Sequence, residues 1–420
     1  MLRNRSFAVL GLCSLSLFAG CGSEDSGIYG SGMNSGSVEG REPDPMGGQG
    51  GTLTAGDWDD NLNFSLYQKY VAGYRNADSS IPVIPTGDRV IIKVVSDSGD
   101  PVSNALVKVA GTNQTYLTAP TGTDGQVLFF PQHDGAVQET NFTVTVDPPP
   151  GQTGIDPVSQ AAPMMGADWT ITLPGAQKNL PLELDLAFVI DATGSMGDEL
   201  DYLKVEVQGI ADRIQSEFQT VSIRYALVMY RDHGDAYITQ KFDFTSDLAA
   251  FKQNLDAQKA EGGGDTPEAM DEAMQVVPEL SWSSSNTARM SFLLADAPPH
   301  KETRAAMLEA INALRPMGVK LFPIAASGVD TEAEFLMRVG AQATQGRYLF
   351  LTDDSGVGNA HAEPTIPCYH VQKLNDLVFR VIASELTGER VEAAPAEILR
   401  SVGEPVEGVC TLKDGSFAYL

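Results

Sequence analysis

Five side chains in the second half of this sequence carry hard oxygen atoms in an arrangement that suits a divalent cation. They are Asp191, Thr193, Ser195, Thr266 and Asp296. Mg²⁺ takes carboxylate, hydroxyl and water oxygens in octahedral geometry. The two carboxylates neutralise such an ion, and the three hydroxyls are uncharged, so the metal keeps its affinity for one more ligand from outside. The residue types therefore predict a metal site that accepts a carboxylate from a partner.

The elements around these donors must bring them to one place. Apolar strands are predicted at 184–190, directly before Asp191, and at 291–295, directly before Asp296. Further strands are predicted at 225–229, 320–325 and 348–351, and helices at 200–218, 247–258, 267–280, 303–314, 332–343 and 372–386. This alternation predicts a doubly wound, mostly parallel α/β fold. Ligands of such sheets bind beyond the C-terminal strand ends, where all three donor segments are expected.

Each donor segment also has an ordinary structural interpretation. Thr266 before a proline is typical of a helix N-cap with proline at the first helical position. Asp296 before Ala-Pro-Pro is also compatible with a simple strand end, and residues 191–195 with the cap of the next helix. Asp265 is a competing donor beside Thr266. Because all the donors are expected at one sheet edge, their combination favours the metal site.

These residues resemble the von Willebrand factor A (VWA) family and its metal-ion-dependent adhesion site, D-x-[ST]-x-S with a distal Thr and a distal Asp. The resemblance covers about residues 183–390. Asp191, Thr193 and Ser195 match the first motif, with Thr where Ser is commoner, while Thr266 and Asp296 match the distal positions. It implies a bound Mg²⁺, or Mn²⁺ or Ca²⁺, and a protein ligand with an exposed Asp or Glu.

The segment 230–235, Tyr-Arg-Asp-His-Gly-Asp, resembles part of one bacterial branch of the same family. We take it as support for the family and not as a second ligand set. Two of the five histidines, His233 and His300, lie near the candidate site in sequence. They are interpreted as polar loop residues, and no Cys/His cluster indicates zinc.

Two other functions compete with binding. A metal-dependent hydrolase is one, since an open coordination position can activate water. The sequence shows no positioned general base, no G-x-S-x-G elbow around Ser195 and no phosphate-binding loop, so a non-enzymatic role is favoured. A passive envelope scaffold with a structural metal is the other; it predicts metal-dependent melting without a metal-dependent ligand.

The N-terminus reads as a lipoprotein signal peptide over residues 1–20. Arg3 and Arg5 precede an apolar run at 7–18 that is too short to span a membrane, and Leu-Phe-Ala-Gly-Cys resembles a lipobox ending at Cys21. The alternative is an ordinary signal peptide. Lipidation of Cys21 would anchor the protein to the bacterial cell envelope, and the anchor would be stable because several acyl chains insert together. Since Gly follows Cys21, the outer membrane or cell surface is favoured over the inner membrane.

Four further segments complete the predicted organisation. A Gly/Ser-rich tether covers 21–56, a short helical or irregular segment 57–87, a small β-sandwich 88–177, and a tail 391–420. The sandwich resembles transthyretin-like and carboxypeptidase-regulatory-like modules, which implies a spacer.

Asp57 to Asn63 resembles a calcium loop, but Leu62 stands where an EF-hand needs Gly, so a polar turn is favoured. In an oxidising compartment Cys368 and Cys410 are expected to form a disulfide; two separate buried thiols are the alternative. Residues 353–370 are expected to form an exposed insertion.

The amino-acid composition excludes some classes of binding partner. The 420 residues include 28 Lys and Arg against 55 Asp and Glu, for a formal net charge of −27. Such a charge argues against a nucleic acid or an anionic lipid surface as the partner. It also means that a carboxylate ligand is repelled at long range and attracted only near the bound cation.

Overall fold

The computed structural model describes residues 53–420, except 164–167, 265 and 357–362. The predicted signal peptide, Cys21, most of the tether and the competing donor Asp265 therefore lie outside the described residues. Among the helices that are described, none is long and apolar enough to cross a membrane.

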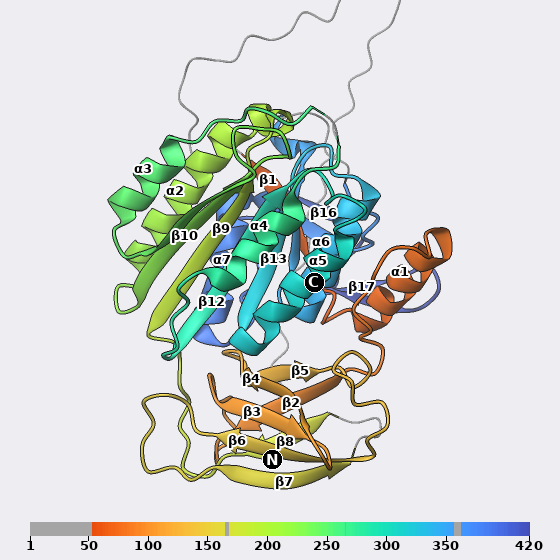
Figure 1. Ribbon diagram of the computed structural model, residues 1–420, viewed down its shortest axis with the longest axis vertical. Coiled ribbons are helices and arrows are strands. Elements are labelled where there is room, and N and C mark those ends of the chain that lie inside the picture. The colour runs from red at the N-terminus through yellow and green to blue at the C-terminus, as the bar shows by residue number, and fades with distance from the viewer. Residues whose placement is uncertain (1–52, 164–167, 265, 357–362) are drawn as a thin grey trace, which may run out of the picture. The chain divides into compact units, whose positions relative to one another are not determined.

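A nine-stranded sheet is the centre of the larger part of the fold (Figure 1). Its strands lie in the order β11-β10-β9-β12-β13-β14-β1-β15-β16. Strands β10, β9, β12, β13 and β14 pair in parallel, and the strands outside this block pair antiparallel. The sheet comprises β1 (Thr54–Trp58), β9 (Glu183–Asp191), β10 (Ser222–Tyr230), β11 (Thr239–Thr245), β12 (Thr287–Ala295), β13 (Val319–Ala325), β14 (Tyr348–Thr352), β15 (Tyr369–Lys373) and β16 (Arg400–Val402). The predicted doubly wound α/β fold is confirmed.

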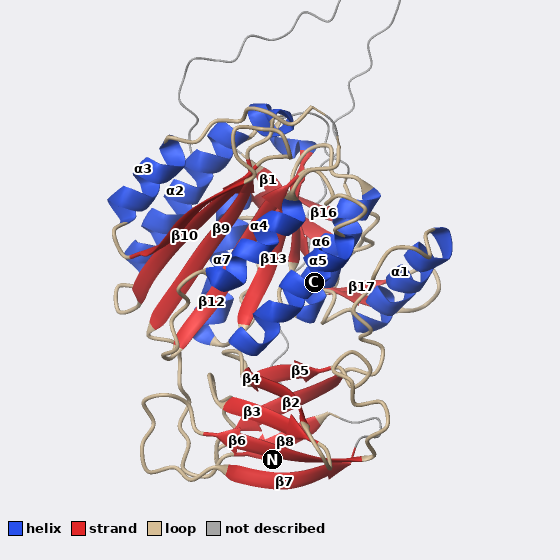
Figure 2. Cartoon of the chain, in the orientation of Figure 1, coloured by secondary structure: helices blue, strands red, loops and turns tan. Residues whose placement is uncertain are grey.

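Helices cover both faces of this sheet (Figure 2). Alternate residues of β9 separate the two cores: Leu186, Phe188 and Ile190 pack with α2, α3 and α7, and Ala187 and Val189 pack with α4, α5 and α6. The α-helices are α1 (Phe64–Ala77), α2 (Leu200–Glu217), α3 (Leu248–Asp256), α4 (Met270–Val276), α5 (Arg304–Leu314), α6 (Thr331–Ala343) and α7 (Leu374–Thr387). Single turns of 3-10 helix lie at Gly194–Asp198, Val277–Glu279, Arg315–Met317 and Asp353–Ser355. Burial of both faces explains why β9 is apolar throughout.

The sheet includes strands that the sequence analysis did not predict. The tether was expected to run to residue 56, but Thr54–Trp58 is β1, which pairs antiparallel with both β14 and β15. Strand β15 begins within the last two residues of the predicted insertion, where Tyr369 is buried; β16 lies in the predicted tail, and β11 forms the opposite edge. Polar residues obscure β1 in the sequence: Thr54 Oγ1 lies 2.8 Å from Thr352 Oγ1 and Asp57 binds Arg380 at 2.7 Å, so these side chains are buried with partners.

The tail is joined to the sheet by the predicted disulfide. Cys368 and Cys410 are bonded, with their Cα atoms 6.1 Å apart, and both are buried. Cys410 lies in β17 (Val409–Thr411), which pairs with β18 (Phe417–Tyr419). Residues 400–420 are therefore attached to the main sheet by both β16 and a covalent bond.

The smaller part of the fold is the expected β-sandwich. Its sheets have the orders β5-β2-β8 and β4-β3-β6-β7. The strands are β2 (Val90–Val95), β3 (Leu106–Ala110), β4 (Thr115–Pro120), β5 (Gln126–Phe129), β6 (Asn141–Asp147), β7 (Val158–Pro163) and β8 (Trp169–Thr172). Phe129, Phe142 and Trp169 pack together between the sheets, with ring centroids 5.4–6.0 Å apart.

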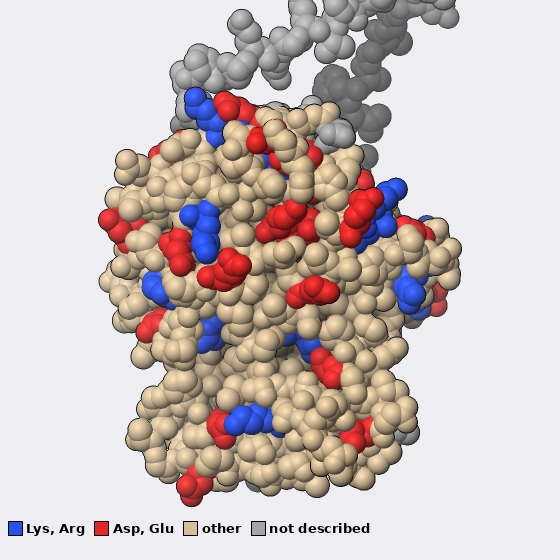
Figure 3. Space-filling model, viewed as in Figure 1, with Lys and Arg blue, Asp and Glu red and all other residues tan. Residues whose placement is uncertain are grey.

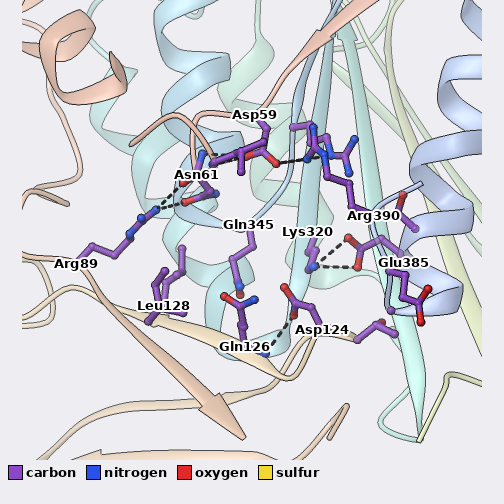
Figure 4. A pocket seen from close by; sticks show the side chains of 17 residues that line it. Asp59, Asn61, Arg89, Asp124, Gln126, Leu128, Lys320, Gln345, Glu385 and Arg390 are labelled. Carbon is purple, nitrogen blue, oxygen red and sulfur yellow. Dashed lines mark hydrogen bonds and ion pairs between the residues drawn. The ribbon is translucent and has the colours of Figure 1, made fainter. Parts of the chain in front are cut away.

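Polar contacts join the sandwich to the α/β part. The Arg315 guanidinium donates to both carboxylate oxygens of Asp134, at 2.7 and 3.0 Å. A polar cavity of about 460 Å³ lies beside this contact region, between the two parts (Figure 4). Its charged side chains are largely paired with one another, as Lys320 with Glu385 at 2.9 Å and Arg390 with Asp59 at 2.6 Å.

Candidate metal centre

Two strand ends supply the carboxylates of the candidate site. Asp191 is the last residue of β9, and Asp296 directly follows β12, the strand that pairs in parallel with β9. Strand β10 lies on the other side of β9, where Tyr230 is paired with Asp191. The structure therefore places both carboxylates at the C-terminal edge of neighbouring parallel strands, as the sequence predicts.

The first motif folds back on Asp191. Asp191 Oδ1 accepts hydrogen bonds from the backbone N–H of Thr193 at 2.9 Å and from its hydroxyl at 2.7 Å. The Thr193 hydroxyl also lies 3.0 Å from Ser195 Oγ. Asp191 and Thr193 are fully buried, whereas Ser195 is exposed. These three donors are thus adjacent, and the group opens to solvent at Ser195.

The protein satisfies the two oxygens of the Asp191 carboxyl group unequally. Its second oxygen, Oδ2, is buried and makes no hydrogen bond of good geometry within the described residues, although the buried Tyr230 hydroxyl interacts with the carboxylate. Burial, with the negative charge of Asp296 as the next cause, raises the pKa of Asp191 to about 7. A cation bound here would contact Oδ2, and its positive charge would lower the pKa of Asp191 against the effects of burial and of Asp296.

Glu268 is a third buried carboxyl group at this site, which the sequence analysis did not include among the donors. It is 3% exposed, and its Oε2 has no hydrogen-bond partner within the described residues. Burial raises its pKa to about 9, and the charges of Asp191, Asp232, Asp296 and Asp235 add to this. The available signal was an acidic residue two positions after Thr266. Three acids therefore crowd one edge of the sheet, which favours a cation between them.

Thr266 lies in the loop that closes over the first motif. The backbone N–H of Gly194 donates to Gly262 O at 3.0 Å, so this loop contacts the 191–195 segment directly. Thr266 itself is exposed, and it lies between Gly263, which packs on Thr193, and the buried Glu268. The structure thus brings the Thr266 loop to the site, but within the described part of the chain no hydrogen bond joins the Thr266 side chain to Asp191, Thr193 or Ser195.

Asp235 holds this loop in place. Its Oδ2 accepts from the backbone N–H of Gly263 at 2.8 Å and from that of Asp232 at 3.1 Å. The approach is so close that a Cβ on Gly262 would lie 2.4 Å from the Asp235 carboxylate, and Gly262 has φ of +82°. The segment 230–235 therefore has a structural role beside the candidate site.

We expect Gly262→Ala to weaken Mg²⁺ binding at the candidate site about tenfold, because the left-handed backbone and the close Asp235 force the loop to move. Isothermal titration calorimetry measures the change. Gly264→Ala is the matched control, since a Cβ there meets nothing within 4 Å and no left-handed φ is required. Equal affinities for the two variants would contradict a role of this loop.

The α/β part has a VWA-type fold. Residues 185–355 match the family model of the von Willebrand factor A domain.

Among curated proteins, the chain is 39% identical over 125 residues to a putative ariadne-like RING finger protein, R811, of Acanthamoeba polyphaga mimivirus. It is also 39% identical over 101 residues to von Willebrand factor A domain-containing protein 7 of Rattus norvegicus. These matches cover 29% and 23% of the chain but only 12% and 11% of those proteins. Among solved structures, it is similar to the vWF domain of the type V pili tip protein Mfa5 from Porphyromonas gingivalis, with 13% identity, 51% of this chain and 99% of that chain covered, and a TM-score of 0.35.

Proposed function

We propose that the VWA domain binds a partner protein through a divalent metal ion at the C-terminal edge of its sheet. VWA domains mediate protein–protein interaction, and we assign this activity to Asp191, Thr193, Ser195, Thr266 and Asp296. Mg²⁺ is the favoured ion, with Mn²⁺ or Ca²⁺ as alternatives. We propose that the partner supplies an Asp or Glu carboxylate.

One observation carries this proposal: the buried carboxyl groups of Asp191, Asp296 and Glu268 interact at one place that is open to solvent beside Ser195. Hard oxygen donors of this kind suit Mg²⁺. A bound ion would supply Lewis acidity toward an external carboxylate. The residues of the chain would position that ion, because the two Thr193 hydrogen bonds to Oδ1 fix the orientation of the Asp191 carboxyl group.

The acidic character of the chain fits this mode of binding. Figure 3 shows acidic side chains, interspersed with basic ones, over the face that it presents, and the formal net charge of the whole chain is −27. A bound cation would create a local positive site on this surface, so an acidic ligand would be attracted there and repelled elsewhere. No nucleic acid is expected to bind.

We further propose that the protein is anchored to the bacterial cell envelope through lipid on Cys21, at the outer membrane or the cell surface. The support is the lipobox-like sequence before Cys21. The predicted tether would then hold the VWA domain away from the membrane, because it leads directly into β1 of the nine-stranded sheet; the β-sandwich follows β1 in the chain and does not separate the anchor from this sheet.

A pull-down from envelope extract tests the binding function. With Mg²⁺ present, the wild-type chain is expected to retain a partner that is lost on adding EDTA and is not retained by Asp191→Ala. Asp212→Ala is the control variant: Asp212 is an exposed aspartate on α2 that pairs with Lys252 at the surface, so its loss should leave capture intact. Recovery of the same proteins in every condition would contradict the proposal.

A further inference from the structure

Three potential transition-metal ligands meet beside the candidate magnesium site. Asp232 and His233 lie in the loop after β10, and His300 lies in the loop after β12. One ligand atom from each lies within 4.8 Å of the other two. His300 Nε2 is 2.7 Å from Asp232 Oδ1, and the rings of His233 and His300 are 5.3 Å apart, edge to face. Sequence positions 68 residues apart thus form one group.

The surrounding backbone holds the two loops in this arrangement. Asp235 accepts from the N–H of Asp232 and fixes the first loop. The second loop is tied down by the N–H of Glu268, which donates to Pro298 O at 3.0 Å, two residues before His300. Asp232 is 8% exposed, and the His233 side chain is 52% exposed. Backbone hydrogen bonds therefore hold the two loops together, and solvent can reach the group at His233.

The donor chemistry differs from that of the first site. Two imidazole nitrogens and one carboxylate oxygen suit Zn²⁺ and other divalent transition ions, and are poor ligands for Mg²⁺ or Ca²⁺. His233 Nε2 also lies 2.6 Å from Glu272 Oε1. A carboxylate that contacts a ligating histidine commonly orients the ring and increases its basicity. Glu272 is placed to do this or to become a fourth ligand.

The charge around the group also favours a cation. Asp232 and Asp235 lie in the loop after β10, and Glu272 contacts His233. The charges of Asp232 and Asp235 also help to raise the pKa of the buried Glu268, so this carboxyl group is nearby as well. Glu268 Oε2 is a buried oxygen with no hydrogen-bond partner within the described residues. Arg231, the nearby cation of this loop, is directed to Lys259 O and to Glu261.

We propose that Asp232, His233 and His300 form a second metal site, selective for a divalent transition ion such as Zn²⁺. This site is distinct from the five oxygen donors of the proposed magnesium site and does not depend on that proposal. It would link the loops after β10 and β12, and so stabilise the edge of the sheet on which the first site is built.

Zn²⁺ titration of the full chain tests the site, with Mg²⁺ in large excess to occupy the oxygen-rich site. All proteins carry Cys13→Ser and Cys21→Ser, so that no free thiol competes for Zn²⁺. The reference protein is expected to bind one Zn²⁺. His300→Ala and His233→Asn are each expected to weaken binding at least about 100-fold, and Glu272→Gln about 10–100-fold, as for the loss of an outer-shell partner.

Three further measurements make the result decisive. His370→Asn is the matched control, because His370 lies on β15 and contacts Ser401 instead; it should bind Zn²⁺ like the reference. Asp191→Asn should retain one Zn²⁺, and loss of Zn²⁺ in this variant overturns the proposal by placing the ion at the first site. Melting in EDTA verifies that the variants fold, which is expected for the exposed His233. Unchanged affinity in both His233→Asn and His300→Ala overturns the proposal and leaves ordinary hydrogen-bonded histidines.

Discussion

In EDTA at pH 8, Asp191→Asn is expected to be more stable than the wild-type protein, although it no longer binds Mg²⁺. Burial and the neighbouring Asp296 raise the pKa of Asp191 to about 7, so the folded protein holds a proton that the unfolded chain releases near pH 4. Stability therefore falls as the pH rises through this interval, by up to about 4 kcal/mol. Asparagine has no charge to bury and retains an oxygen for the two Thr193 hydrogen bonds.

The direction in which stability changes with pH distinguishes Asp191 from other carboxyl groups in the protein. An acid whose pKa is raised by folding stabilises the folded state at low pH and loses that contribution at high pH. Asp59, whose pKa the Arg390 and Arg347 guanidiniums hold below its usual range despite burial, contributes in the opposite direction. Such groups contribute equally to the wild type and to Asp191→Asn, so they drop out of the difference between the two free energies of unfolding. The stability advantage of Asp191→Asn should therefore increase from pH 4 to pH 8.

Urea unfolding across this pH range, with and without Mg²⁺, measures the effect. Saturating Mg²⁺ at about 100 times its Kd should stabilise the wild type by about 2.7 kcal/mol and leave Asp191→Asn unchanged. Asp185→Asn is the matched control: Asp185 is also buried on β9, but it accepts two hydrogen bonds from Arg224, at 2.8 and 2.6 Å. That change should destabilise at every pH. A wild type more stable than Asp191→Asn in EDTA at pH 8 would contradict charge crowding at the site.

Part of the candidate site could be predicted because it follows strand ends. The apolar runs before Asp191 and Asp296 predict buried parallel strands, and the sheet geometry then places both carboxylates at one edge. Thr193 and Ser195 follow by local spacing. The hydrogen bonds from Thr193 to Asp191 are contacts between residues two positions apart, so local sequence contains nearly all the information about them.

Other parts depend on contacts between distant loops. Glu268 belongs to the site because its loop meets the Pro298–Pro299 segment after β12, and nothing in the spacing of either loop indicates this. The same is true of His300 and Asp232: the sequence predicts only a polar loop residue at His300, and local spacing does not indicate that Asp232 lies 2.7 Å from it. Side chains with several ordinary uses acquire a specific role only when a second loop is placed beside them.

The N-terminal strand shows a second limit of sequence patterns. β1 was missed because it lacks a long alternating pattern and is followed by a run of acidic residues. In the structure Asp59 and Asp60 bind Arg390 and Arg338. The predicted polar turn before α1 is present, and Asp59 Oδ1 accepts from the N–H groups of Asn61 and Leu62 within it. The arginine partners lie more than 270 residues away, beyond the reach of local spacing.

Asp60→Ala is expected to destabilise the protein by about 3–5 kcal/mol, because it leaves the Arg338 guanidinium buried without its main partner. Arg338 donates to the two Asp60 oxygens at 2.9 and 2.8 Å, and the side chains are 5% and 1% exposed. Trp58 Nε1 also donates to Asp60 at 2.9 Å, and the Arg338 guanidinium lies over the Tyr70 ring. Urea unfolding followed by tryptophan fluorescence measures the loss.

An exposed pair and a double variant separate the causes of this loss. Lys69 and Asp414 are 64% and 58% exposed, so Asp414→Ala should have little effect on stability. Asp60→Leu combined with Arg338→Met removes both charges and should recover much of the stability lost in Asp60→Ala. No recovery would mean that the Trp58 contact matters more than the ion pair. Whether or not the double variant recovers stability, a loss of about 3 kcal/mol or more in Asp60→Ala would mean that the turn after β1 is needed for the stability of the nine-stranded sheet. The predicted tether would then end before β1, which begins at Thr54.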